Sequence, residues 1–184
     1  TGNGIPLMEH YRCQPSIIEY CNNIARYRLE VKTKLRASPL KTNLIAHHVE
    51  GNIEGKVNKQ EVIAIRELIP RLLNQGYSLE DIGVISPFKV HADALREDLC
   101  SRRNFPEFHK DDIGTIHTFQ GSQKRVIILS TKVCRPQDNF NFINRKLNLL
   151  NVAVSRAEEL FILVGNLYRL EKAGGYTERL VKHI

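Results

Sequence analysis

The sequence predicts an α/β domain in which helices cover both faces of a mainly parallel sheet. Short apolar runs alternate along the chain with segments of helical periodicity, as in parallel strands joined by crossover helices. Two of the runs, 126–129 and 160–164, are apolar at every position rather than at alternate positions. Strands of this kind are buried on both faces. We therefore expect a three-layer architecture with these two runs in the middle of the sheet.

The same patterns place the individual elements. We expect strands in the apolar runs at 44–49, 82–86, 112–119, 126–133 and 160–164. Helical periodicity predicts helices at 15–29, 58–75, 147–158 and 177–184, and one on the face marked by Ala92, Leu95 and Leu99. Pro70 lies inside the second helix and predicts a kink or a break there. The first helix precedes the strands, so it either lies across the sheet or belongs to a neighbouring domain.

Composition narrows the partners and the compartment. The 184 residues suit one domain with a short appendage, and 27 Lys and Arg against 20 Asp and Glu leave a net charge of +7. This excess favours a polyanionic partner such as nucleic acid. No apolar run reaches the roughly 18 residues of a membrane span, and no secretory leader opens the chain. We expect a cytoplasmic protein, in the bacterial cytosol or nucleoid or in a eukaryotic nucleus.

The cysteines and histidines predict no metal site. Cys13, Cys21, Cys100 and Cys134 lie far apart and form no CxxC pair. Reduced and mostly buried thiols are therefore expected rather than zinc ligands or a disulfide framework.

Two polar segments flank predicted helices. Arg12 comes just before the first helix, where its planar guanidinium can reach an anion. The alternative is a solvated arginine beside the start of a helix. Ser86 and Pro87 end the strand at 82–86. Pro87 is expected to expose Ser86 and nearby backbone amides, which suit phosphate. The alternative is an ordinary strand-to-helix turn.

Two further segments lie later in the chain. Alternation over 114–119 would put Thr115, His117 and Phe119 on one face, before a polar turn at 120–124 that suits phosphate and ribose. A merely polar loop is the alternative there. Arg156 is expected in the last turn of the helix at 147–158. It either stabilises that helix end or points at a γ-phosphate as an arginine finger. The polar loop at 135–146 is expected at the edge of the sheet where ligands bind.

In this order, the four segments resemble motifs IIIa, IV, V and VI of the superfamily 1 helicases, in the branch of the Upf1-like and Dna2/Nam7-like enzymes. The strongest parts are Tyr11-Arg12 with Pro15, the string Thr-Ile-His-Thr-Phe-Gln-Gly at 115–121, and Asn-Val-Ala-Val-Ser-Arg-Ala at 151–157. The resemblance covers about residues 7–166 and implies a RecA-like domain of the P-loop NTPase type. It divides the chain into a leading helical segment, 1–30, and the second RecA-like domain, 31–184.

The resemblance also implies a nucleotide site that this chain shares with a first RecA-like domain. The chain contains no GxxxxGK[ST] loop, so the first domain, absent from this chain, would supply that loop and the magnesium ligands for ATP with Mg²⁺. Arg12 and Arg156 would reach the γ-phosphate, and Tyr11, Gly121 and Gln123 would lie against the nucleotide. Gln123 stands where the family usually has Glu, so the contact to the ribose would lack a charge.

For the nucleic acid, the resemblance places Ser86, Pro87, Thr115 and His117 against the single strand, mostly at its phosphates and sugars. The family often carries paired Arg just before motif VI, where this chain has Asn148 and Leu149. We expect the C-terminal motor domain of an ATP-dependent DNA or RNA helicase, a hydrolase within its parent protein and inactive in isolation. The alternatives are a non-catalytic nucleic-acid-binding or scaffolding module, and a generic nucleotide-binding domain without affinity for single strands.

Overall fold

The computed structural model describes residues 9–10, 13–25, 30–33, 39–51, 53–119, 123–135, 138, 140–144 and 147–184. Within these residues a five-stranded sheet has the order β3–β9–β8–β6–β7, and every neighbouring pair is parallel. Its strands are β3 (Leu44–His48), β6 (Ile82–Ser86), β7 (Ile113–Thr115), β8 (Lys124–Ser130) and β9 (Ala157–Gly165). Two small two-stranded pairs accompany it: β1 (Glu9–His10) with β2 (Glu30–Val31), and β4 (Ile53–Glu54) with β5 (Val57–Asn58).

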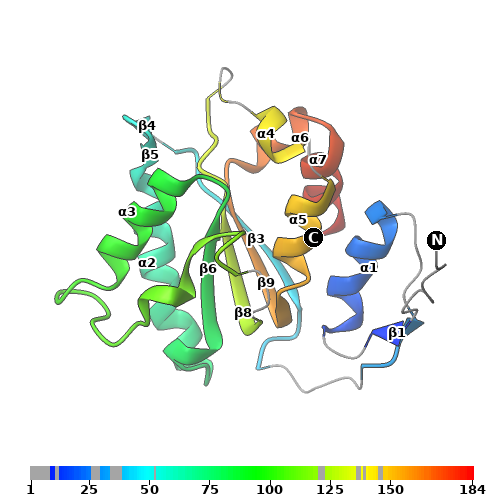
Figure 1. Ribbon diagram of the computed structural model, residues 1–184, viewed down its shortest axis with the longest axis horizontal. Coiled ribbons are helices and arrows are strands. Elements are labelled where there is room, and N and C mark those ends of the chain that lie inside the picture. The colour runs from blue at the N-terminus through cyan, green and yellow to red at the C-terminus, as the bar shows by residue number, and fades with distance from the viewer. Residues whose placement is uncertain are drawn as a thin grey trace, which may run out of the picture.

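Helices cover both faces of the sheet, and the predicted three-layer α/β architecture is confirmed (Figure 1). The helices are α1 (Pro15–Ala25), α2 (Lys59–Asn74), α3 (Lys89–Leu99), α4 (Phe140–Asn144), α5 (Leu147–Val154), α6 (Leu167–Lys172) and α7 (Gly175–His183). Single turns of 3₁₀ helix, η1 (Leu79–Asp81) and η2 (Lys110–Asp112), precede β6 and β7. In the described part of the chain, no helix combines the length and apolarity needed to cross a membrane.

The two faces of β8 belong to two separate cores. Ile127 and Leu129 point into the core under α1, α5 and α7, whereas Val126 and Ile128 point into the core under α2 and α3. All four side chains are fully buried. Burial of a side chain of this size contributes about 1.5–3 kcal/mol relative to exposure. The unbroken apolar run thus reflects a strand between two helical layers, as predicted.

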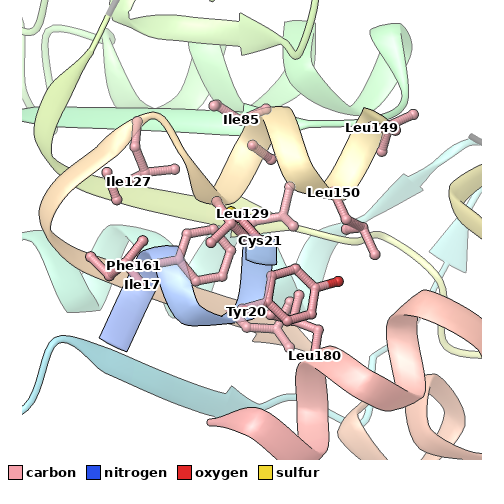
Figure 2. Close-up of a cluster of buried hydrophobic side chains, with 14 of the residues drawn as sticks. Ile17, Tyr20, Cys21, Ile85, Ile127, Leu129, Leu149, Leu150, Phe161 and Leu180 are labelled. Carbon is pink, nitrogen blue, oxygen red and sulfur yellow. The ribbon is translucent and has the colours of Figure 1, made fainter. Parts of the chain in front are cut away.

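Helix α1 packs against α5, α7 and β9 and completes the first of these cores (Figure 2). Ile17, Tyr20 and Cys21 are each at most 1% exposed, and the Tyr20 hydroxyl donates to the Tyr176 carbonyl over 3.1 Å. In this structure α1 therefore packs on the same domain, which answers the alternative that the sequence left open.

The four cysteines are free, and three of them, Cys13, Cys21 and Cys134, are buried. Burial, together with the neighbouring Cys13, raises the pKa of the Cys21 thiol to about 12. The prediction that most of these thiols are buried is confirmed.

Of the kink or break predicted at Pro70, the break is wrong, because α2 runs through it from Lys59 to Asn74. Pro70 is exposed, whereas Ile65, Ile69 and Leu72 form a buried stripe on both sides of it. Continuous packing of this stripe against the sheet offsets the one helical hydrogen bond that proline cannot donate.

Three other predicted elements end earlier than expected. The strand predicted at 126–133 is β8 and ends at Ser130. The strand predicted at 112–119 stops at Thr115, whose carbonyl accepts the N–H groups of Thr118 (3.0 Å) and Phe119 (3.4 Å) in a turn. The alternation expected for 115–119 is therefore wrong. The helix predicted at 147–158 stops at Val154, which places Arg156 in the turn before β9 rather than in the helix.

The described start of the connection from β7 to β8, residues 116–119, lies against the sheet. Phe119 is 1% exposed and packs on Gly83 of β6. A Cβ added at Gly83 would lie 2.7 Å from Phe119 Cε1 and 2.8 Å from Ile127 Cδ1. The absence of a side chain at position 83 is what lets this connection lie so close to the strand.

We expect Gly83→Ala to destabilise the chain, because overpacking a filled core costs about 1–3 kcal/mol and outweighs the roughly 0.5–1 kcal/mol that alanine gains over glycine in a strand. Urea unfolding of the single variant, of Phe119→Leu and of the double variant measures this. The shorter leucine should relieve the clash, so the double variant should lose less than the sum of the two single losses. A Gly83→Ala protein as stable as the wild type would show that Phe119 does not pack there.

Candidate functional site

The residues that the sequence singled out divide between two opposite edges of the sheet. Pro87 directly follows β6, and Thr115 and His117 lie at the carboxyl end of β7. Gln123 and Arg156 directly precede β8 and β9. The seven residues of β8 separate the two edges by about 20 Å. The structure therefore shows two candidate sites, one at each edge.

At the amino edge, backbone pairing brings Gln123 and Arg156 together. Lys124 and Ala157, the residues that follow them, are partners in the β8–β9 register, and the Lys124 N–H donates to the Arg156 carbonyl over 3.1 Å. Both site residues are half-buried. The guanidinium of Arg156 and the side-chain amide of Gln123 thus lie where two neighbouring strands begin.

The segment before α1 meets the same edge. The Cys13 thiol donates to the Ser155 carbonyl over 3.3 Å, and the Gln14 N–H donates to the Glu158 carbonyl over 2.9 Å. These bonds join the residues just after Arg12 to the turn that holds Arg156. Tyr11, Arg12 and Gly121 themselves lie outside the described residues.

A second arginine at this edge, Arg125, has a structural role. Arg125 donates to both carboxylate oxygens of Glu159, over 3.1 and 2.9 Å, and to Asp81 over 3.2 Å. Its guanidinium also lies 5.0 Å from the centre of the Tyr77 ring. Bidentate pairing of this kind holds β8 against β9 and η1.

At the carboxyl edge, Pro87, Thr115 and His117 line one cavity of about 460 Å³. Ser86 does not line it: this side chain is fully buried, and its hydroxyl accepts the Phe88 N–H over 3.3 Å. The prediction that Pro87 exposes Ser86 is therefore wrong. β6 stays between two helical layers to its last residue, and the hydroxyl satisfies the turn that follows.

Other residues of this cavity were missed from the sequence. Lys56, Lys89, Lys132 and Phe142 also line it, and no carboxylate is among the described residues that line it. Lys89 lies two residues after Pro87, so the sequence alone could have indicated it as a residue of this site. Lys56 comes from the β4–β5 turn and Lys132 from the end of β8, so only the fold brings them together.

The predicted polar loop at 135–146 does border this edge, because its short helix α4 carries Phe142. Asp138 anchors the start of the loop by accepting the N–H groups of Cys134 (2.8 Å) and Arg135 (2.7 Å). Burial raises the pKa of Asp138, but these bonds and the Arg135 guanidinium outweigh it and hold the pKa below its ordinary value.

A fully buried polar network lies next to the cavity and was also missed. Oε2 of Glu61 accepts the Ser130 hydroxyl (2.5 Å) and the Lys132 N–H (2.8 Å), while Oε1 accepts the Asn58 amide (3.0 Å). The Asn58 N–H donates to Nδ1 of His91, so Nε2 carries the proton that this ring donates to Ser130 over 2.8 Å. The spacing Asn-x-x-Glu at 58–61 is a helix-capping signal that could have located this network.

The network holds Lys132 in an unusual backbone conformation. Lys132 has φ +66°, which costs a residue with a side chain about 1–3 kcal/mol. Glu61 accepts its N–H, and Asn58 donates to its carbonyl over 3.3 Å. Buried polar groups thus clamp both sides of the residue whose side chain lines the cavity.

We expect Glu61→Gln to lower the free energy of unfolding by about 1–3 kcal/mol, since an amide there must turn one donor toward another donor and leave a buried group unsatisfied. The matched control is Glu67→Gln on the exposed face of the same helix, which should stay within about 0.5 kcal/mol of the wild type. Equal urea midpoints for the two variants would contradict the assigned network.

Comparison with known proteins identifies the class of protein to which this chain belongs. Residues 3–168 match the AAA domain family. The chain belongs to this family and is a superfamily 1 helicase domain of the Upf1-like branch, as the motifs predicted.

Individual relatives are similar over part of the chain. The uncharacterized ATP-dependent helicase C05C10.2 of Caenorhabditis elegans is 32% identical over 69% of this chain and 8% of its own length. The DNA polymerase alpha-associated DNA helicase A of Saccharomyces cerevisiae is 29% identical over 65% and 17%. The Drosophila melanogaster homolog of regulator of nonsense transcripts 1 is 27% identical over 64% and 10%. The chain spans less than a fifth of the length of each of these relatives.

Proposed function

We propose that this chain is the C-terminal motor domain of an ATP-dependent superfamily 1 helicase that acts on single-stranded DNA or RNA. The observation that supports this most is the meeting of three motif-bearing segments at the amino edge. Gln123 and Arg156 precede paired strands there, and Cys13 and Gln14 are hydrogen bonded to the turn around Arg156.

In this proposal the amino edge faces ATP bound to a first RecA-like domain. Arg156 and Arg12 approach the γ-phosphate, where a guanidinium offsets the charge that develops in the transition state. Tyr11, Gly121 and Gln123 lie against the rest of the nucleotide, with the Gln123 amide able to bond a ribose hydroxyl. Among the described residues no group of three His, Cys, Asp or Glu side chains could hold a metal ion, and we propose that the first domain supplies the ligands for Mg²⁺.

The carboxyl edge would hold the single strand. Pro87, Thr115 and His117 line the cavity there, and Ser86 contributes by holding the turn rather than by contact. The connection from β7 to β8 joins the two edges, so nucleotide-dependent movement at Gln123 is transmitted toward Thr115. Closure and reopening against the first domain would then move this grip along the strand.

Gln123 supports a second candidate function, that of a non-catalytic module that has the same fold and binds nucleic acid. The motif resemblance implies Glu at this position, whereas this chain has Gln, whose amide lacks the charge of a carboxylate. The two candidates differ in one respect that can be measured, which is ATP hydrolysis by the parent protein.

In a protein that carries this chain after its first RecA-like domain, Arg156→Ala should lower nucleic-acid-stimulated ATP hydrolysis by about 10³-fold, the value of an arginine finger. The matched control is Arg103→Ala, an exposed arginine in the loop between α3 and β7, which should leave the rate unchanged. A rate for Arg156→Ala within about twofold of the wild type would refute the finger assignment. The 184-residue chain alone should hydrolyse essentially no ATP, and robust turnover by it would contradict the shared site.

The chain should bind single-stranded oligonucleotides weakly and in a salt-sensitive manner, because phosphate contacts release counterions. Lys132→Ala should weaken this binding and reduce the slope of log K against log salt by about 1. Lys172→Ala removes an exposed lysine on α6, away from the cavity, and is expected to change neither quantity. Identical slopes for all three proteins, measured by fluorescence anisotropy, would argue against strand binding at this cavity.

A further inference from the structure

We propose that the cavity at the carboxyl edge takes a nucleobase stacked on Phe142, so that this domain grips a single strand by a base as well as by phosphates. The inference rests on the proposed strand-binding function and adds to it the part of the nucleotide that is recognised. Motif resemblance alone predicts contacts mainly to phosphates and sugars.

The first support is an exposed aromatic surface in a cavity of suitable size. In the described part of the chain three large apolar side chains are exposed, and two of them, Phe142 (43%) and Val90 (49%), line this cavity. The Phe142 ring centre lies 5.5 Å from that of Phe88, at an angle of 35°. A volume of about 460 Å³ is within the range of about 300–1,000 Å³ for a site that holds one small ligand.

The second support is the charge around this aromatic surface. Lys56, Lys89 and Lys132 line the cavity with His117, and none of the three lysines forms an ion pair with a carboxylate of the described residues. The Lys132 ammonium lies 4.6 Å from the centre of the Phe88 ring. An apolar floor bordered by cations suits a ligand with a flat apolar body and anionic links on either side. A nucleotide within a strand has this composition.

The third support is that the helix that carries Phe142 is anchored to the domain by its neighbouring residues. Ile143, the next residue of α4, is fully buried. Asn144, the last residue of α4, donates to the Gly174 carbonyl over 3.0 Å and accepts the Thr177 N–H over 3.0 Å at the start of α7. A fixed platform loses little conformational entropy when a base stacks on it.

Stacking of this kind selects single strands over duplexes. In a duplex both faces of each base are already stacked, so insertion into the cavity requires unstacking. A base in a single strand is available, and base–aromatic stacking is sequence-tolerant because every base has a π face.

The chain contains no tryptophan, so Phe142→Trp places a single fluorescent reporter at the proposed stacking position. Oligothymidylate of about 12 nucleotides should quench this fluorescence on binding, whereas an abasic oligonucleotide of equal length and charge should bind without quenching. Equal quenching by the two would overturn base stacking and leave strand binding intact. Absence of binding by either, at low salt, would overturn the strand-binding function and the stacking with it.

The affinity of the 184-residue chain gives a second, independent readout. Phe142→Ala should weaken binding of oligothymidylate about tenfold and leave binding of the abasic strand unchanged. Tyr168→Ala, which removes an exposed aromatic side chain on α6 outside the cavity, should leave both affinities unchanged. Equal losses for the two oligonucleotides would assign Phe142 a structural role only, and tighter binding of an acidic peptide than of oligothymidylate would assign the cavity to a protein partner.

Discussion

Burial of β6, β8 and β9 on both faces is the constraint on which the rest of this structure depends. The middle of each strand lies between two helical layers, and Val126 to Leu129 are fully buried. A polar ligand-binding group in that position would lose its water without finding the ligand. The groups that can act chemically are therefore displaced to the two ends of the strands, and this is why the candidate sites form at opposite edges.

The network around Glu61 shows how polar groups can be buried in this fold, which is by bonding to one another. Glu61, His91 and Ser130 are fully buried, and each has hydrogen-bond partners within the network. Because these bonds are made in a water-free environment, loss of one member leaves the others unsatisfied. The network also fixes the backbone of Lys132, whose side chain lines the cavity.

The connection from β7 to β8 is the physical link between the two edges. It begins beside the cavity at Thr115, packs on Gly83 through Phe119, and reaches the amino edge at Gln123. A helix would occupy this position in most parallel crossovers. Residues 116–119 of this connection instead form a turn that packs against the sheet.

The sequence by itself determined the layer architecture and the family, because both depend on local signals. Unbroken apolar runs mark doubly buried strands, and the motif strings at 115–121 and 151–157 are contiguous in the chain. The tertiary structure decided what depends on separate segments meeting. It buried Ser86, carried α2 through Pro70, and turned the chain at Thr115 because packing against the sheet outweighs local preference. It also gathered Lys56, Lys132 and Phe142 around one cavity. These three residues come from different connections, and no periodicity relates them, so only the closure of the sheet's carboxyl edge could bring them together.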